Sequence, residues 1–235
     1  MKTQLYSYIL YFHIFCGFTA LSIGLAIILI KKGTPNHIKA GMIYFWSMSG
    51  IFVTTLLLLC IAPEKGHLWF LAGVSIFSFY QTYSGRRMVQ QKGRQIEANQ
   101  TDWFALAVLL ISSVWSFFKS VQCILEGESF RAGLFLFFAF LGSTLVLKDF
   151  RIFTKKVSQE KLHWFYQHIS RMMGSYAATT TAFLVNVVPK HLPETTPGLV
   201  FLSLWVAPGV LIGYFTSSYV NSLKNGRNRK VLSSE

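Results

Sequence analysis

The chain has 235 residues, of which 52% are hydrophobic, 16% are aromatic and only 13% are charged, and its formal net charge is +13. Soluble domains carry about 25% charged residues, so this composition excludes an ordinary water-soluble domain and a disordered chain. It favours a membrane protein with several spans. Excess Lys and Arg are typical of the cytoplasmic loops of such proteins, so we expect no nucleic-acid partner.

Seven apolar segments are long enough to cross a bilayer, which takes about 20 helical residues each. They cover residues 6–30, 38–61, 67–85, 103–125, 131–150, 163–188 and 197–222. Short connections rich in Gly, Pro and Asn separate them and leave no room for a soluble domain. The sequence therefore predicts an all-α polytopic transmembrane helix bundle of seven spans, forming one domain over residues 1–235. We expect a multi-pass protein of the cell membrane, which in a bacterium is the inner membrane.

The basic residues also predict an orientation. With the N-terminus outside, sixteen of the 22 Lys and Arg residues fall in cytoplasmic loops and the C-terminal tail, and five fall outside. The remaining one, Arg171, lies within the sixth span. Cytoplasmic loops are enriched in Lys and Arg, so we expect the N-terminus outside and the C-terminus in the cytoplasm. The first span is expected to be retained, because the N-terminus lacks the features of a cleaved signal peptide.

The first three spans each present a face of small or polar residues. These faces comprise His13, Gly17, Ala20 and Gly24 in the first span, His37, Gly41, Tyr44 and Met48 in the second, and Ser75, Ser78, Thr82 and Gly85 in the third. Small residues let transmembrane helices approach one another closely, so we expect these faces to point toward the inside of the bundle. The start of the fourth span has a different signal, because Asp102 followed by Trp103 predicts a helix N-cap and an interfacial aromatic.

A polar stripe runs along the sixth span. It comprises His168, Ser175, Thr179 and Asn186, with Arg171 to one side. Lipid cannot satisfy these groups, so they are expected to face other helices or water. Ser175, Thr179 and Asn186 are therefore candidates for lining a pathway. For Arg171 two interpretations remain open: an ion pair with Asp149 or Asp102, or a site for an anion such as a haem propionate or a lipid headgroup.

The seventh span carries Gly209 and Gly213 after Pro208, which predicts a kink and close packing. The cysteines show no Cys-x-x-Cys spacing. Cys60 and Cys123 both fall at the outer ends of their spans, and whether they form a disulfide stays open.

The histidines are the strongest candidates for binding a cofactor, because imidazole ligates haem iron and metal ions and also transfers protons. His37 and His168 are expected near the cytoplasmic side and His13 near the outside, about 20 Å away along the membrane normal. Two separate sites would suit a di-haem protein. The candidate cofactor-binding residues are His13, His37, His168, Arg171, Tyr44 and Tyr176, and the candidate metal ligands are His37 and His168. In the alternative interpretation each histidine bonds a backbone carbonyl or lies at the interface.

Three stretches together resemble a known family. They are His13–Gly24, the segment 32–44 with its His-x-x-x-Gly-x-x-Tyr pattern, and the segment 168–177 with His-x-x-Arg-Met-x-x-Ser-Tyr. This combination resembles a family of uncharacterised bacterial membrane proteins of the DUF2306 type. The resemblance covers about a third of the chain and implies that His13, His37 and His168 belong to one recurring pattern. It implies no activity.

These observations leave four hypotheses. The leading one is transmembrane electron transfer by b-type haem or a metal held by inward-facing histidines. The alternatives are a small-solute or ion transporter or channel, a metal-dependent intramembrane hydrolase using Asp102, Asp149, His37 and His168, and an assembly subunit of a membrane complex. Whether the protein is an enzyme is left open, and no catalytic residue is assigned. Besides the lipid bilayer, we expect a homo-oligomer or another membrane protein as partner.

Overall fold

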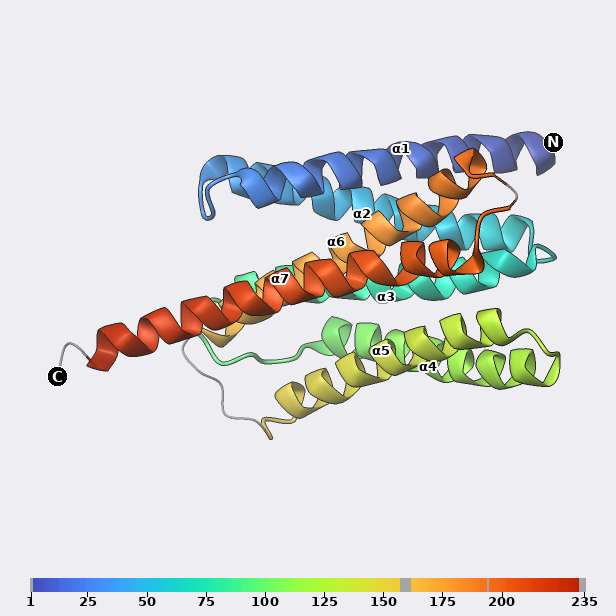
Figure 1. Ribbon diagram of the computed structural model, residues 1–235. Coiled ribbons are helices and arrows are strands. Elements are labelled where there is room, and N and C mark those ends of the chain that lie inside the picture. The colour runs from blue at the N-terminus through green and yellow to red at the C-terminus, as the bar shows by residue number, and fades with distance from the viewer. Residues whose placement is uncertain (1, 157–161, 194, 233–235) are drawn as a thin grey trace.

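The computed structural model describes residues 2–156, 162–193 and 195–232, and within these residues it is all-α. The seven long helices are α1 (Lys2–Leu29), α2 (Pro35–Ile61), α3 (Gly66–Gln90), α4 (Gln100–Leu125), α5 (Ser129–Phe153), α6 (His163–Val187) and α7 (Gly198–Leu232). A short 3₁₀ helix, η1 (Val188–His191), follows α6. The helices run side by side, with the pair α1–α2 on one side, the pair α4–α5 on the other, and α3 and α6 between them (Figure 1).

The all-α bundle of seven long helices predicted from the sequence is confirmed. Among the described residues, five helices are long and apolar enough to cross a membrane: α1, α2, α4, α5 and the part of α7 from Gly198 to Gly226. The two others, α3 and α6, carry more polar side chains, and they are the helices packed between the outer pairs. A helix that contacts other helices on most sides does not need an apolar surface, because protein groups satisfy its polar atoms. The N- and C-terminal ends lie at opposite ends of the bundle, and their orientation in the membrane remains a prediction.

Two helices begin at clear local signals. Thr34 caps α2, where its hydroxyl accepts a hydrogen bond from the His37 amide and Pro35 occupies the first turn. At α4 the predicted N-cap is wrong, because the cap is Asn99 rather than Asp102. The Asn99 side chain accepts from the Asp102 amide at 2.9 Å, and the Asp102 carboxylate accepts from the Asn99 amide at 3.0 Å. Asp102 is thus the third residue of a capping box, one turn inside the helix.

Part of the small-residue face of α1 packs into the bundle, as expected, whereas a β-carbon at Gly17 would meet no atom within 4 Å. Ala20 and Gly24 are buried against α2 and α6. A β-carbon added at Gly24 would lie 2.5 Å from the Tyr176 ring and 3.1 Å from the Tyr44 ring. On α7 the expectation of close packing is wrong, because β-carbons at Gly209 and Gly213 would meet no atom within 4 Å. The side of α7 that is buried carries Thr216 and Val220 instead, so the two glycines face outward.

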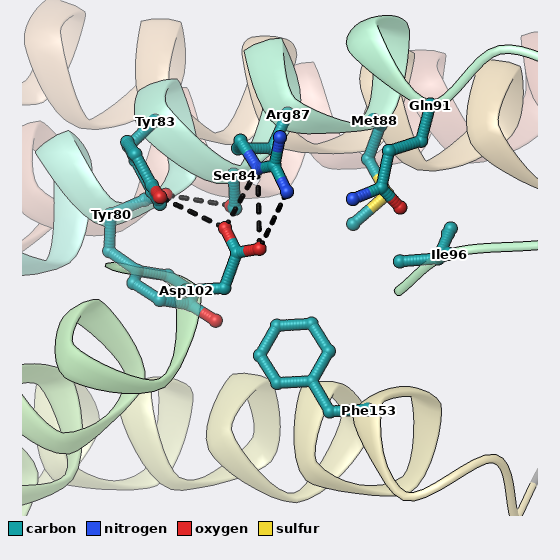
Figure 2. Close-up of a pocket in the computed structure, with 9 residues that line it drawn as sticks. All are labelled: Tyr80, Tyr83, Ser84, Arg87, Met88, Gln91, Ile96, Asp102 and Phe153. Carbon is teal, nitrogen blue, oxygen red and sulfur yellow. Dashed lines mark hydrogen bonds and ion pairs between the residues drawn. The ribbon is translucent and has the colours of Figure 1, made fainter. Parts of the chain in front are cut away.

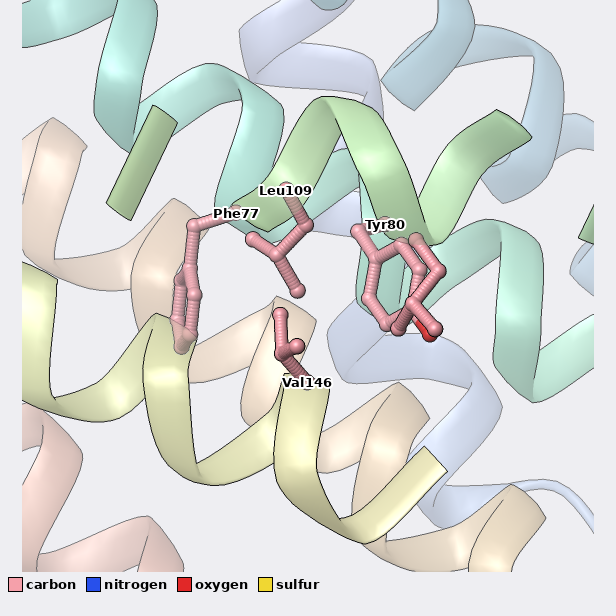
Figure 3. Close-up of a cluster of buried hydrophobic side chains, with 5 residues drawn as sticks. Phe77, Tyr80, Leu109 and Val146 are labelled. Carbon is pink, nitrogen blue, oxygen red and sulfur yellow. The ribbon is translucent and has the colours of Figure 1, made fainter. Parts of the chain in front are cut away.

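The pair α4–α5 is joined to the rest of the bundle by an apolar cluster. Phe77 and Tyr80 of α3 pack against Leu106 and Leu109 of α4 and Val146 of α5 (Figure 3). The Tyr80 ring belongs to this cluster while its hydroxyl reaches a polar partner, so the residue connects the apolar core with the polar interior.

Candidate functional site: the polar interior between α3 and α6

Buried polar side chains concentrate on the two central helices. On α3 they are Ser75, Ser78, Gln81, Thr82 and Ser84, and on α6 they are Gln167, Arg171, Ser175, Thr179 and Thr181. Polar groups within a membrane span are costly and need partners. The contact between α3 and α6 therefore forms a polar interior within the bundle.

The centre of this interior is a fully buried ion pair. Arg171 of α6 is 2% exposed and Asp149 of α5 is completely buried. The guanidinium donates to both carboxylate oxygens of Asp149, including a bond of 2.8 Å from Nη1, and Nη1 also donates to the Ser84 hydroxyl at 2.7 Å. The Tyr80 hydroxyl donates to the same carboxylate. Of the two ion-pair partners left open for Arg171, the structure selects Asp149.

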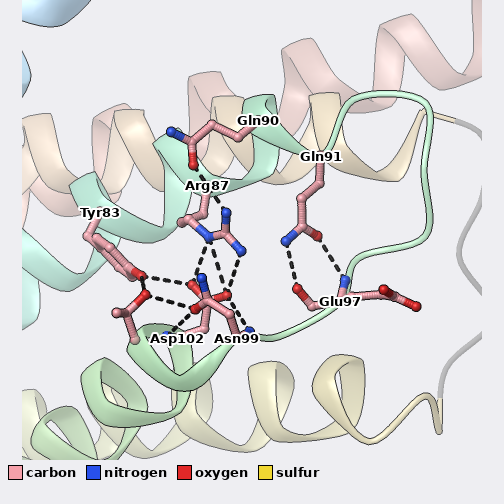
Figure 4. A network of polar contacts seen from close by, with 8 residues as sticks. Tyr83, Arg87, Gln90, Gln91, Glu97, Asn99 and Asp102 are labelled. Atoms are coloured by element: carbon pink, nitrogen blue, oxygen red, sulfur yellow. Dashed lines mark hydrogen bonds and ion pairs between the residues drawn. The ribbon is translucent and has the colours of Figure 1, made fainter.

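Asp102 pairs with a different arginine, at the end of α3. Arg87 binds its carboxylate in a two-pronged arrangement, with bonds of 2.9 Å from Nε and 2.8 Å from Nη2, and the Tyr83 hydroxyl donates at 2.9 Å (Figure 4). The Arg87 side chain is 21% exposed, so this bridge lies closer to the surface than Arg171–Asp149.

A small cavity lies beside the Arg87–Asp102 bridge. Its walls include Arg87 and Asp102 themselves, together with Tyr80 and Ser84, which bond Asp149 and Arg171 (Figure 2). Its volume of about 10 Å³ is at the lower limit for one water molecule, and the surface that it exposes is apolar.

A chain of hydroxyl groups begins one turn further along α6. The Ser175 hydroxyl lies 2.6 Å from that of Thr82 on α3 and 2.9 Å from that of Tyr44 on α2, and both Ser175 and Thr82 have no exposed surface. On the next turn, the Thr179 hydroxyl donates to the Ser175 carbonyl at 3.0 Å and contacts the Met48 sulfur at 3.4 Å. Hydroxyl groups from α2, α3 and α6 thus lie within hydrogen-bond distance of one another.

Several buried atoms along the same contact have no hydrogen-bond partner among the described residues. They are Ser75 Oγ, Gln81 Nε2, Gln167 Oε1 and Arg171 Nε, together with His37 Nδ1 at the start of α2. Unsatisfied buried polar atoms are rare in folded proteins, and ordered water usually satisfies them.

Two histidines have a defined tautomer. His168 Nδ1 lies 2.9 Å from the Gly85 carbonyl, which only accepts, so Nδ1 carries the proton and Nε2 keeps its lone pair. His13 Nδ1 lies 2.8 Å from the Thr54 hydroxyl, whose own hydrogen is donated to the Gly50 carbonyl at 2.6 Å. His13 therefore also donates from Nδ1, and in the neutral ring its lone pair is at Nε2.

The structure brings some of the predicted site residues together and separates others. His37 lies close enough to His168 for their charges to interact, whereas His13 contacts α2 some 17 residues further along that helix, about 25 Å away. Tyr44 belongs to the hydroxyl chain, and Tyr176 packs on Gly24. Asn186 is exposed, and its amide donates to the Ala182 carbonyl of its own helix.

Other predicted groups do not gather at this site. Cys60 is exposed, Cys123 is buried, and both are unpaired. Within the described residues, the one group of three metal-ligating side chains is Cys123, Glu126 and Glu128 at the turn between α4 and α5. It contains none of the histidines or aspartates considered for a hydrolase.

Sequence reasoning missed Tyr80 and Ser84 as members of the site. They lie four residues apart on α3, on the side that faces the Arg171–Asp149 pair rather than on the Ser75–Gly85 face. The available signal was Asp149, the single carboxylate of the fifth span, which requires donors from its neighbours.

The fold and the polar interior define an integral, multi-pass membrane protein. No family model, curated protein or solved structure matches the chain. The resemblance of the histidine pattern to the DUF2306 type therefore stays a prediction, and any specific function has to be argued from the site.

Proposed function

We propose that the protein conducts protons across the membrane through the polar interior between α3 and α6. The observation that carries this proposal is the fully buried Arg171–Asp149 pair next to the hydroxyl chain of Thr82, Ser175 and Tyr44. Ionisable groups inside a membrane are retained for function more often than for stability, and proton relays are a common use.

One half of the path runs from the Arg87–Asp102 bridge to the buried pair. The one-water cavity lies next to the Asp102 carboxylate and the Ser84 and Tyr80 side chains, and these two side chains contact Arg171 and Asp149. The side-chain oxygens of Asp102, Tyr80 and Ser84 therefore surround this end of the path.

The other half follows α6 toward the far end of the bundle. From Arg171 to Thr179 the helix rises by about 12 Å, and Ser175 supplies a hydroxyl midway. Beyond the Met48–Thr179 contact, Thr54 of α2 lies further along the buried side of that helix and holds His13. The lone pair at His13 Nε2 is a proton acceptor, since imidazole exchanges protons near neutral pH.

The dimensions of the path favour protons over larger solutes. Hydroxyl groups within 3 Å of one another pass protons without an open pore, and the cavity on this path has room for about one water. A sugar or an amino acid would need a much larger cavity.

The experiment is a proton-uptake assay in vesicles that contain the purified protein, a pH-sensitive dye and a valinomycin-clamped potassium potential. We expect the double variant Thr82→Val with Ser175→Ala to slow uptake by about tenfold, equivalent to a barrier raised by about 1.4 kcal/mol. The matched control is Asn186→Ala, a polar residue of the same helix outside the path. Equal rates for the double variant and the wild type would contradict the proposal.

A second candidate function, binding of b-type haem or a metal ion for electron transfer, is favoured by His168. A ligating histidine usually donates from one ring nitrogen to a carbonyl while the other faces the metal, and His168 has this arrangement at Gly85. His37 is the neighbouring imidazole, and its Nδ1 has no partner in the described part of the chain. Together they would supply two ligands from α2 and α6, and bound haem would carry electrons.

Absorption spectra of the oxidised and dithionite-reduced protein, with metal analysis on the same sample, test this candidate. It predicts a Soret band or stoichiometric metal that is lost in His168→Gln and retained in His191→Gln, whose histidine is exposed on η1. Protein produced with ample haem that has neither colour nor metal would exclude it.

A further inference from the structure

A second cavity lies at the opposite end of the seam between α3 and the pair α4–α5, away from the Arg87–Asp102 bridge. Its volume is about 300 Å³, which is within the range of small-molecule sites. It is formed by the first turn of α3, the last turns of α4 and the start of α5. None of the residues proposed for the proton path lines it.

One wall of this cavity is aromatic. Trp69 of α3 and Trp115 of α4 have ring centres 5.8 Å apart, and Trp115 meets Phe135 of α5 edge to face at 5.7 Å. Trp is enriched where a membrane helix passes from hydrocarbon to headgroups. This wall is therefore suited to the boundary between acyl chains and headgroups.

The other wall is polar and carries both signs of charge. Lys119 Nζ donates to Gln122 Oε1 at 2.8 Å, and the Gln122 amide donates to the Glu126 carboxylate at 2.7 Å. Among the described residues, no carboxylate lies within ion-pair distance of the Lys119 ammonium. Arg131 adds a second cation, which pairs with Glu128.

We propose that this cavity binds the headgroup of a zwitterionic phospholipid. The phosphate would lie at Lys119 and Arg131, the ammonium group would lie at Glu126, and the acyl chains would leave along the tryptophans. Lys and Arg bind phosphate oxygens by charge-assisted hydrogen bonds. On this wall the Lys119 ammonium and the Glu126 carboxylate are joined through Gln122. A headgroup that carries a phosphate and an ammonium group complements these two charges.

Native mass spectrometry of the detergent-purified full chain tests this proposal, with added phosphatidylethanolamine as the probe. We expect one lipid to bind the wild type, and the double variant Lys119→Gln with Arg131→Gln to bind at least fivefold more weakly. Lys190→Gln, a cation on η1 that does not line the cavity, is the matched control and is expected to bind like the wild type. Lys119→Arg is expected to retain binding, which separates loss of charge from loss of folding.

Two further arms identify the ligand. Phosphatidylglycerol, which lacks the ammonium group, is expected to bind more weakly than phosphatidylethanolamine. Soluble phosphoethanolamine is expected not to displace the lipid. Equal lipid binding by the double variant and the wild type, equal binding of the two lipids, or full displacement by soluble phosphoethanolamine would overturn the proposal.

Discussion

At the scale of single residues, Arg171 forms the buried ion pair at the centre of the polar interior. A guanidinium placed among helices needs its carboxylate, because breaking one side of a buried ion pair leaves an uncompensated charge. Asp149 supplies that carboxylate, while Tyr80 and Ser84 add hydrogen bonds around it.

We expect Asp149→Asn to lower the free energy of unfolding by about 3–5 kcal/mol, because it leaves Arg171 buried without its counter-ion. The double variant Asp149→Leu with Arg171→Met is expected to recover most of this loss. Unfolding midpoints in one detergent measure both effects. A double variant as unstable as Asp149→Asn would contradict this view of the pair.

Gly24 makes a second prediction at this scale. Gly24→Ala is expected to destabilise the protein by about 1–3 kcal/mol, because the new methyl group would overlap the Tyr176 ring. Gly17→Ala on the same helix is the control, since a β-carbon there meets nothing within 4 Å. The same unfolding measurement checks both, and equal effects of the two substitutions would contradict the packing of α1.

At this scale the sequence predicted several residues of the polar interior but not their partners. For Arg171 it left open whether the guanidinium binds an anion or pairs with Asp149 or Asp102. The choice depends on which helix lies beside α6, and neither helical periodicity nor loop length specifies this. The pairing of His37 with His168 at one site stays a prediction. Asn186 shares the angular position of Thr179 but lies two turns further, where the bundle no longer covers the helix.

At the scale of the helices, the end of α3 and the start of α4 are held by one polar network. Arg87, Tyr83 and Asn99 all bond the Asp102 side chain. The capping box and the ion pair therefore stabilise the same turn.

We expect Arg87→Gln to loosen this junction. Amide hydrogen exchange in residues 91–104 is predicted to accelerate, because the Asp102 carboxylate loses its charged donor, while exchange in α1 and α2 stays unchanged. The control is Arg86→Gln, whose guanidinium lies over the Phe45 ring instead. Faster exchange throughout the bundle would indicate a global effect and contradict the local role.

The helix ends illustrate what hydropathy detects. Predicted and observed starts differ by four residues or fewer, because the apolar segments begin soon after their caps. The sequence-based ends of the third and seventh spans fall short, since α3 continues to Gln90 and α7 to Leu232 through polar residues. Hydropathy reports where lipid begins and ends, whereas a helix continues into water as long as its backbone bonds are favourable.

At the scale of the whole molecule, the sequence predicts the class of fold but does not predict which face of each helix is buried. Composition and seven apolar segments predict the bundle, because the bilayer admits few other structures. Gly24 of α1 packs tightly against its neighbours but Gly209 and Gly213 of α7 do not, although each helix carries glycines along one face. Which face is buried depends on neighbours that the local pattern does not specify.

The orientation gives a prediction for the whole molecule. In a variant with all three cysteines replaced, a single Glu64→Cys is expected to react with a membrane-impermeant maleimide in intact cells. A single Lys92→Cys is expected to react only after permeabilisation, because the basic loops face the cytoplasm. The reverse pattern of labelling would show that the N-terminus lies inside.

The central claim is that protons pass through the interior between α3 and α6. The most direct test is the initial rate of proton uptake into vesicles containing wild-type protein, compared with protein-free vesicles of the same lipid under the same valinomycin potential. We expect faster uptake in the protein-containing vesicles, in proportion to the number of protein molecules per vesicle. Identical rates in the two preparations, with the protein shown to be folded and inserted, would contradict it.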